Sequence, residues 1–198
     1  MDVSFTSAVV ILVLVMDPVG NIPLFVSALR QVEAPRRARV ILRECLIAFA
    51  VLLLFVFFGG TILGVLGLSD AALGIAGGLI LFLVALRMIF RHPEGIFGDS
   101  PAAEPFIVPL ATPAIAGPAA IATVMLLVSR EPQRLVEWCA AVTIAMLVAA
   151  VVLTAAERIS QLAGERALLA FERLMGLVLT TIAVEMLLRG IEGFVRGL

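Results

Sequence analysis

The sequence predicts an all-α integral membrane protein of six transmembrane helices, and three observations lead to that prediction. Hydrophobic residues make up 62% of the 198 residues, charged residues make up 15%, and the mean hydropathy is +1.17. Soluble domains are about 45–50% apolar and about 25% charged, and a chain of this length could not bury the excess in a core. The apolar residues also form six runs, each about the 17–25 residues that a helix needs to cross a bilayer.

The six runs are separated by short connections that carry most of the charge. We expect the spans at Phe5–Leu29, Val40–Leu66, Ala71–Phe90, Phe106–Val128, Leu135–Ala156 and Leu168–Gly190. No connection is long enough to separate a soluble domain, so residues 1–198 are expected to form a single membrane domain. The first run carries Asp17 and lacks a basic segment before it, so we interpret it as a retained helix and not as a cleaved signal.

The basic residues predict how the chain is oriented in the membrane. The chain has no lysine, and ten of its 14 arginines lie at the first, third and fifth connections, against four on the opposite side. Cytoplasmic connections of membrane proteins carry an excess of Lys and Arg. We therefore expect both termini on the periplasmic, or outer, side of a multi-pass protein.

The two halves of the chain resemble each other at matching positions. Two prolines lie five residues apart in the first run, and two more have the same spacing in the fourth run, at an offset of 95. Three helices in each copy is an odd number, so the second copy enters the membrane upside down. The pattern therefore predicts a 3+3 inverted-topology repeat, with copies at about 1–92 and 101–198. Chance similarity between apolar segments is the alternative.

The four prolines predict that helices 1 and 4 are broken at Pro/Gly motifs. Pro18, Pro23, Pro113 and Pro118 each lack an amide hydrogen and clash with the carbonyl four residues earlier. The carbonyl groups left without a helical donor would be those of Leu14, Val19, Pro109 and Ala114. Broken helices at matching positions of two halves indicate a transport site. The alternative is a pair of simple proline kinks.

Five residues at these breaks are the candidate substrate-binding residues. Asp17 is a carboxylate within a membrane span, which costs at least about 2.5–3.5 kcal/mol and so indicates a function. Asn21 lies four residues further on, and Thr112 takes the place of Asp17 in the second copy. Gly20 and Gly117 lie where half-helix N-termini could hold a carboxylate. In the alternative interpretation, Asp17 only caps the half-helix that begins at Pro18.

Arg87 and Glu185 occupy corresponding places in the third and sixth runs. Opposite charge at related positions predicts a role in gating or coupling. The alternative is snorkelling, in which each side chain reaches the nearer membrane surface. Gly60 and Gly64, like Gly74 and Gly78, have the spacing of close helix packing, either within the fold or at a homo-oligomer contact.

No motif indicates an enzyme. The sequence holds no Gly-x-Ser-x-Gly elbow, His-Glu-x-x-His motif, dinucleotide fingerprint or phosphate loop. We therefore expect no catalytic residue, metal or cofactor. The net charge of -1 gives no basis for a nucleic-acid partner.

The two proline motifs resemble those of the MarC family of bacterial and archaeal inner-membrane proteins. The resemblance rests on MDPVGNIPLF at residues 16–25 and on PLATPAIAGPAAI at residues 109–121. It implies an inner-membrane location and, by similarity to some archaeal members and to LysE-type exporters, transport of small neutral amino acids. One departure is Glu185, where the family pattern commonly has glutamine, so a role for this residue is not carried over.

The sequence thus predicts a secondary transporter of small neutral amino acids or similar metabolites that works by alternating access. Asp17 is the candidate proton carrier or ammonium partner, because a desolvated carboxylate can titrate. Sodium coupling, and import as against export, stay open. Two other classes are a pore for small solutes and a membrane scaffold or regulator that carries no flux.

Overall fold

The computed structural model describes residues 3–30, 32–90 and 110–196, and every regular element in these ranges is helical. The helices are α1 (Phe5–Met16), α2 (Ile22–Ala28), α3 (Ala34–Leu66), α4 (Asp70–Ile89), α5 (Pro118–Arg130), α6 (Leu135–Thr154) and α7 (Ala156–Arg196). A π-helical turn, η1 (Leu110–Ile115), precedes α5, and a short 3-10 turn, η2 (Pro132–Arg134), joins α5 to α6. The prediction of an all-α chain is confirmed.

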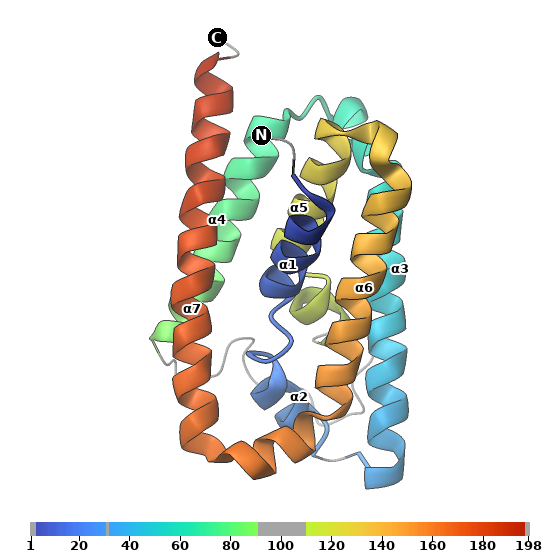
Figure 1. Ribbon diagram of the computed structural model, residues 1–198, viewed down its shortest axis with the longest axis vertical. Helices are drawn as coiled ribbons and strands as arrows, with labels where there is room; N and C mark the ends of the chain where they lie inside the picture. Colours follow the sequence, from blue (N-terminus) through green and yellow to red (C-terminus); the bar gives the residue numbers. More distant parts are fainter. Residues whose placement is uncertain (1–2, 31, 91–109, 197–198) are drawn as a thin grey trace.

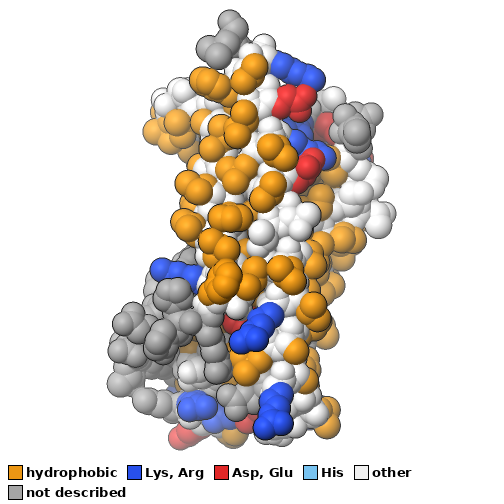
Figure 2. All heavy atoms as spheres, turned by 90° about the vertical axis from the view of Figure 1, so that its left-hand side faces the viewer, with side chains coloured by type: hydrophobic (Ala, Val, Ile, Leu, Met, Phe, Trp, Pro, Cys, Tyr) orange, Lys and Arg blue, Asp and Glu red, His pale blue; other side chains and the backbone are white. Residues whose placement is uncertain are grey.

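The surface is that of a membrane protein. Among the described residues, four helices are long and apolar enough to cross a membrane, namely α3, α4, α6 and α7. Figure 2 shows hydrophobic side chains over the middle of one face, with charged side chains towards both ends. On α7 the exposed apolar side chains include Leu174, Leu177, Leu188 and Ile191, which are 50–61% exposed. An apolar band of this kind requires lipid around it, so the protein is a multi-pass membrane protein.

The helices fall into two groups (Figure 1). Helices α4 and α7 run side by side along most of the length of α4, and α1, α3, α5 and α6 pack together as a bundle. The start of α1 and the end of α7 lie at the same end of the molecule. The two groups meet where α4 packs against α5 and where α2 packs against α7.

Glycines bring the backbones of α4 and α7 together. A Cβ atom at Gly78 would lie 2.9 Å from the carbonyl oxygen of Ala183, and one at Gly190 would lie 3.0 Å from that of Ala71. In lipid there is little hydrophobic driving force to hold helices together. The close approach of the two backbones therefore stabilises the α4–α7 pair through van der Waals contacts. Gly78 is therefore used within the fold, whereas a Cβ at Gly60 would meet no atom within 4 Å.

Two predicted connections are partly helical. Helix α3 begins at Ala34 and not at Val40, with a proline in its first two positions, where a missing amide hydrogen costs nothing. Helix α7 takes in the charged segment 157–166, because Glu, Arg, Gln, Leu and Ala are good helix formers. It bends at Gly164, whose φ of 76° only glycine adopts readily. Residues 106–109 of the predicted fourth span lie outside the described residues.

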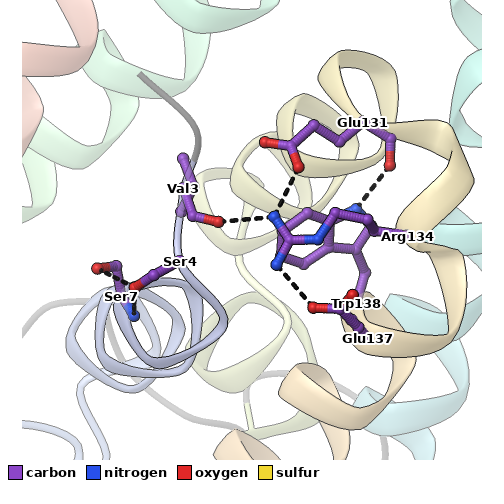
Figure 3. Close-up of polar contacts among 7 residues, drawn as sticks. All are labelled: Val3, Ser4, Ser7, Glu131, Arg134, Glu137 and Trp138. Atoms are coloured by element: carbon purple, nitrogen blue, oxygen red, sulfur yellow. Dashed lines mark hydrogen bonds and ion pairs between the residues drawn. The ribbon is translucent and has the colours of Figure 1, made fainter.

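A cluster around Arg134 fixes the start of α1 to the corner between α5 and α6 (Figure 3). The guanidinium of Arg134 donates to the carbonyl oxygen of Val3 at 2.9 Å and forms ion pairs with Glu131 and Glu137, both at 2.6 Å. It also lies over the ring of Trp138, 4.5 Å from the centroid, and the indole N–H of Trp138 donates to the Glu131 carbonyl at 3.0 Å. Guanidinium groups suit such combined ionic and stacking contacts.

Replacing Arg134 with Ala is expected to loosen the start of α1. The Val3 carbonyl would lose its donor, and two carboxylates would lose their partner, so amide hydrogen exchange in the first turn of α1 should speed up. The matched control is Arg196→Ala, since Arg196 pairs with Glu192 on its own helix, at the exposed end of α7. Equal exchange in the two variants would show that the Arg134 cluster does not hold α1.

Candidate functional site

The first interruption of the helical chain is built around Asp17. Helix α1 ends at Met16, and Asp17 follows in a left-handed conformation with φ of 41° and ψ of 63°. It is the one non-glycine residue with positive φ among the described residues. Asp adopts this region more readily than most residues, yet such strain still costs about 1–3 kcal/mol and concentrates at functional sites. The Asp17 side chain is 8% exposed.

Gly20 completes the turn that Asp17 begins. Its N–H donates to Oδ1 of Asp17 at 3.0 Å. A Cβ atom at Gly20 would overlap the Asp17 carboxylate and would lie 2.8 Å from the methyl carbon of Met88. A side chain at this position would therefore displace the Asp17 carboxylate from its place beside the Gly20 N–H.

Asn21 links the first interruption to the second. Its side-chain NH₂ donates to the carbonyl oxygens of Met16 at 2.9 Å, Asp17 at 3.1 Å and Ala114 at 3.2 Å. Two hydrogens serve three acceptors, so one of these bonds is shared. Ala114 lies 93 residues away in η1, and this contact joins the two halves of the chain.

The second interruption precedes α5. Within η1, Thr112 is extended, with φ of -130° and ψ of 130°. Gly117 is the N-cap of α5, and because glycine has no side chain, it cannot accept from the first N–H groups of the helix. Pro118 is the first helical residue. By helix geometry the N–H groups of Ala119 and Ala120 have no carbonyl one turn earlier to donate to. They form a partial positive charge at this end of α5.

A cavity of about 200 Å³, which we call the Asp17 cavity, lies beside the two interruptions. Its polar side contains Asp17, Gly20, Asn21 and Gly117, together with the first turn of α5. The opposite wall is apolar and comes from α4 and α7, through Ile80, Leu81, Val84, Met88 and Leu179. Four of the five predicted substrate-binding residues thus come together, and Thr112 lies in η1 without lining the cavity.

The carbonyl groups expected to be free are mostly bonded. The carbonyl of Leu14 accepts from the N–H of Asp17 at 3.2 Å, and that of Val19 accepts from the N–H of Ile22 at 3.1 Å. The carbonyl of Ala114 accepts from Asn21, as described, and Pro109 lies outside the described residues. The tight turn and the Asn21 side chain supply the donors that the prolines remove, as buried backbone requires.

Arg87 and Glu185 lie at different levels of the α4–α7 pair. Glu185 forms an ion pair with Arg189, one turn along α7, at 2.6 Å. Gly78 faces the part of α7 near Glu185, and Arg87 is nine residues further along α4, or about 13 Å. Both side chains are exposed. A role for either in gating stays a prediction.

Sequence analysis missed one buried acid. Glu44 on α3 is fully buried, and Arg43 binds its Oε1 through Nε at 3.0 Å and Nη2 at 2.8 Å. The signal was present, since Glu44 lies inside the second apolar run. No group of three or more metal-ligating side chains gathers within the part of the chain that the structure describes.

Replacing Asn21 with Leu is expected to destabilise the protein by about 1–3 kcal/mol, because buried carbonyls would lose their donor. Thermal unfolding in detergent would measure the loss. Thr181→Val is the control, since the Thr181 hydroxyl donates only within its own helix, to Leu177. Equal unfolding temperatures in the two variants would contradict the bridging role of Asn21.

Fold and surface together define an all-helical, multi-pass membrane protein, with a small, partly polar cavity between two interrupted segments. The chain itself belongs to the MarC family of integral membrane proteins, whose model matches residues 3–195.

Relatives of similar length are found in bacteria and archaea. The UPF0056 inner membrane protein YhgN of Escherichia coli K12 is 44% identical over 192 residues, covering 96% of this chain and 98% of that protein. A UPF0056 membrane protein of Buchnera aphidicola from Schizaphis graminum is 40% identical over 191 residues, covering 96% and 97%. One from Methanocaldococcus jannaschii is 33% identical over 196 residues, covering 94% and 86%. No solved structure matches this chain.

Proposed function

We propose that the protein is a secondary transporter that moves small neutral amino acids, or similar small metabolites, across the inner membrane by proton-coupled alternating access. The Asp17 cavity carries this proposal, because it combines a buried carboxylate with the uncapped N-terminus of α5. A zwitterion needs both partners: an acceptor for its ammonium group and donors for its carboxylate.

The size of the cavity supports a small solute. At about 200 Å³ it lies below the 300–1,000 Å³ of sites for drug-sized ligands, although it exceeds the roughly 30 Å³ that one water occupies in the liquid. The apolar wall of Ile80, Leu81 and Val84 suits a short aliphatic side chain. Alanine and glycine fit these limits, and a large aromatic amino acid does not.

The two charged groups of the substrate would bind at opposite sides of the Asp17 cavity. The substrate carboxylate would accept from the N–H groups of Ala119 and Ala120, where the helix dipole favours negative charge. The ammonium group would pair with Asp17, with the Gly20 N–H holding the carboxylate in place. A proton and an ammonium group cannot both neutralise Asp17, so proton entry would release the substrate.

We further propose six spans in a 3+3 inverted repeat, with copies at about 1–92 and 101–198 and both termini on the outer side. Segments α1 and α2 would form one span broken at its Pro/Gly motif, and η1 and α5 would belong to another. The short lengths of α1 and α5 support this, since 12 and 13 residues rise only about 18–20 Å against about 30 Å of hydrocarbon.

Uptake and counterflow of radiolabelled alanine and glycine in proteoliposomes, with and without an imposed pH gradient, test the proposal. Saturable accumulation that follows the gradient is the expected result, with labelled tryptophan excluded by size. Downhill flux that neither saturates nor responds to the gradient would identify a pore instead. No flux of either amino acid would overturn the proposed substrate class and leave a scaffold or regulator.

A further inference from the structure

A second, larger cavity lies on the same boundary between helix groups as the Asp17 cavity. This cavity, which we call the vestibule, has a volume of about 650 Å³ and extends to Val3 and Gly193, near the end where α1 begins. Its walls come from α1, α4, α5 and α7. These four helices also line the Asp17 cavity, so the two cavities lie one above the other between the same helices.

About one helical turn separates the two cavities along α1 and α5, and along α4 Ile80 lies six residues after Gly74. On α1, Ile11 lines the vestibule and Val15 lines the Asp17 cavity. On α5, Thr123 lines the vestibule and Ala120 lines the Asp17 cavity. Three or four residues of helix rise about 5 Å. The barrier between the cavities is therefore thin.

One close contact in this barrier joins α4 to α5. A Cβ atom at Gly77 would lie only 2.6 Å from the Cβ of Ala122, closer than real Cβ contacts. Both residues are buried, and Leu12 of α1, which lies between Ile11 and Val15, is fully buried as well. Two small residues meet here, with the methyl carbon of Met186 3.3 Å from the Cβ position of Gly77. Because Met186 belongs to α7, it would move with α4, and a modest separation of α4 from α5 would open the barrier.

A different set of contacts holds α2 and α3 to α7, beyond the first interruption. Ile22 at the start of α2 is fully buried against Ala156 and Leu168 of α7. Beyond it, Arg37 of α3 and Glu157 of α7 form an ion pair at 2.7 Å. Moving α2 and α3 away from α7 would require breaking an apolar cluster and an ion pair.

We propose that the contact between Gly77 and Ala122 is the gate through which solute passes from the vestibule into the Asp17 cavity. The glycine-packed α4–α7 pair moves as a unit away from α5 to open it. This inference rests on the proposed function for its biological purpose, although the gate itself can be tested without any transport measurement.

The test measures how fast a small, water-soluble methanethiosulfonate reagent labels single cysteines in purified protein in nanodiscs. Cys45 and Cys139, the free cysteines, are first replaced by alanine. Thr123→Cys reports the vestibule, and Ala120→Cys reports the Asp17 cavity. We expect labelling at position 120 to be about tenfold slower or more, because the reagent reaches it only through openings of the gate.

The decisive comparison moves the methyl group of the contact from Ala122 to position 77 and measures labelling at position 120. Gly77→Ala, which forces α4 and α5 apart, should raise labelling at position 120 about tenfold, and adding Ala122→Gly should restore the slow rate. If Gly77→Ala fails to fold, Ala122→Gly alone should raise the rate severalfold by loosening the contact. Gly60→Ala, on an open surface, is the control and should change nothing.

Equal labelling at positions 123 and 120, or no response of position 120 to either gate variant, would overturn the gate. The expected labelling pattern without amino-acid flux would retain the gate and overturn the transport function. Amino-acid flux without the labelling pattern would retain the transport function and overturn the gate.

Discussion

Replacing Asp17 with Asn is expected to abolish pH-gradient-driven accumulation of alanine while leaving the protein folded. Asn adopts the left-handed backbone of position 17 as readily as Asp, and its side-chain oxygen can still accept from the Gly20 N–H, now 3.0 Å from Oδ1. Only the charge and the titratable proton are lost. A hydrogen bond to a charged group contributes about 1.5–3 kcal/mol, so alanine affinity should fall about tenfold to a hundredfold.

The measurement is alanine uptake in proteoliposomes as a function of the imposed pH gradient, with thermal unfolding as the check on folding. Glu192→Gln is the matched control, since it removes a carboxylate from an exposed position at the end of α7. Undiminished gradient-driven accumulation in Asp17→Asn would show that this carboxylate is neither the proton carrier nor the ammonium partner.

Replacing Gly78 with Leu is expected to give the largest loss of stability, about 3 kcal/mol or more, because overpacked sites of this kind cannot relax. The new Cβ would lie 2.9 Å from the Ala183 carbonyl oxygen and 3.0 Å from the Leu187 backbone nitrogen. These are backbone atoms, so α4 and α7 would have to separate along a substantial part of their interface.

Denaturation by SDS in mixed micelles would measure this loss. Gly60→Leu makes the same chemical change on α3, where a Cβ would meet nothing within 4 Å, and should not destabilise the protein. In a helix interior, replacing glycine with leucine is intrinsically favourable by a few tenths to about 1 kcal/mol. Equal stability of the two variants would contradict glycine-mediated packing of α4 on α7.

Much of the candidate site could be predicted from the sequence because its residues are costly in a membrane. Asp17 and Asn21 stand out as polar residues in an apolar run, and Gly20 lies between prolines at a fixed spacing. Such residues carry their information locally, since each one demands a compensating partner. In the proposed binding mode, Ala119 and Ala120 would contribute only backbone N–H groups, and nothing in an alanine's identity indicates such a role.

The sequence by itself determined the membrane class, the all-helical fold and the residues of the first interruption, since hydrophobicity and proline chemistry act along the chain. Tertiary structure alone decided which helices are neighbours: the pairing of α4 with α7, the hydrogen bond from Asn21 to Ala114, and the contact of Gly77 with Ala122. The physical reason is the surrounding lipid. Helix faces that contact lipid and faces that contact other helices are both apolar, so periodicity does not reveal which face packs against which neighbour.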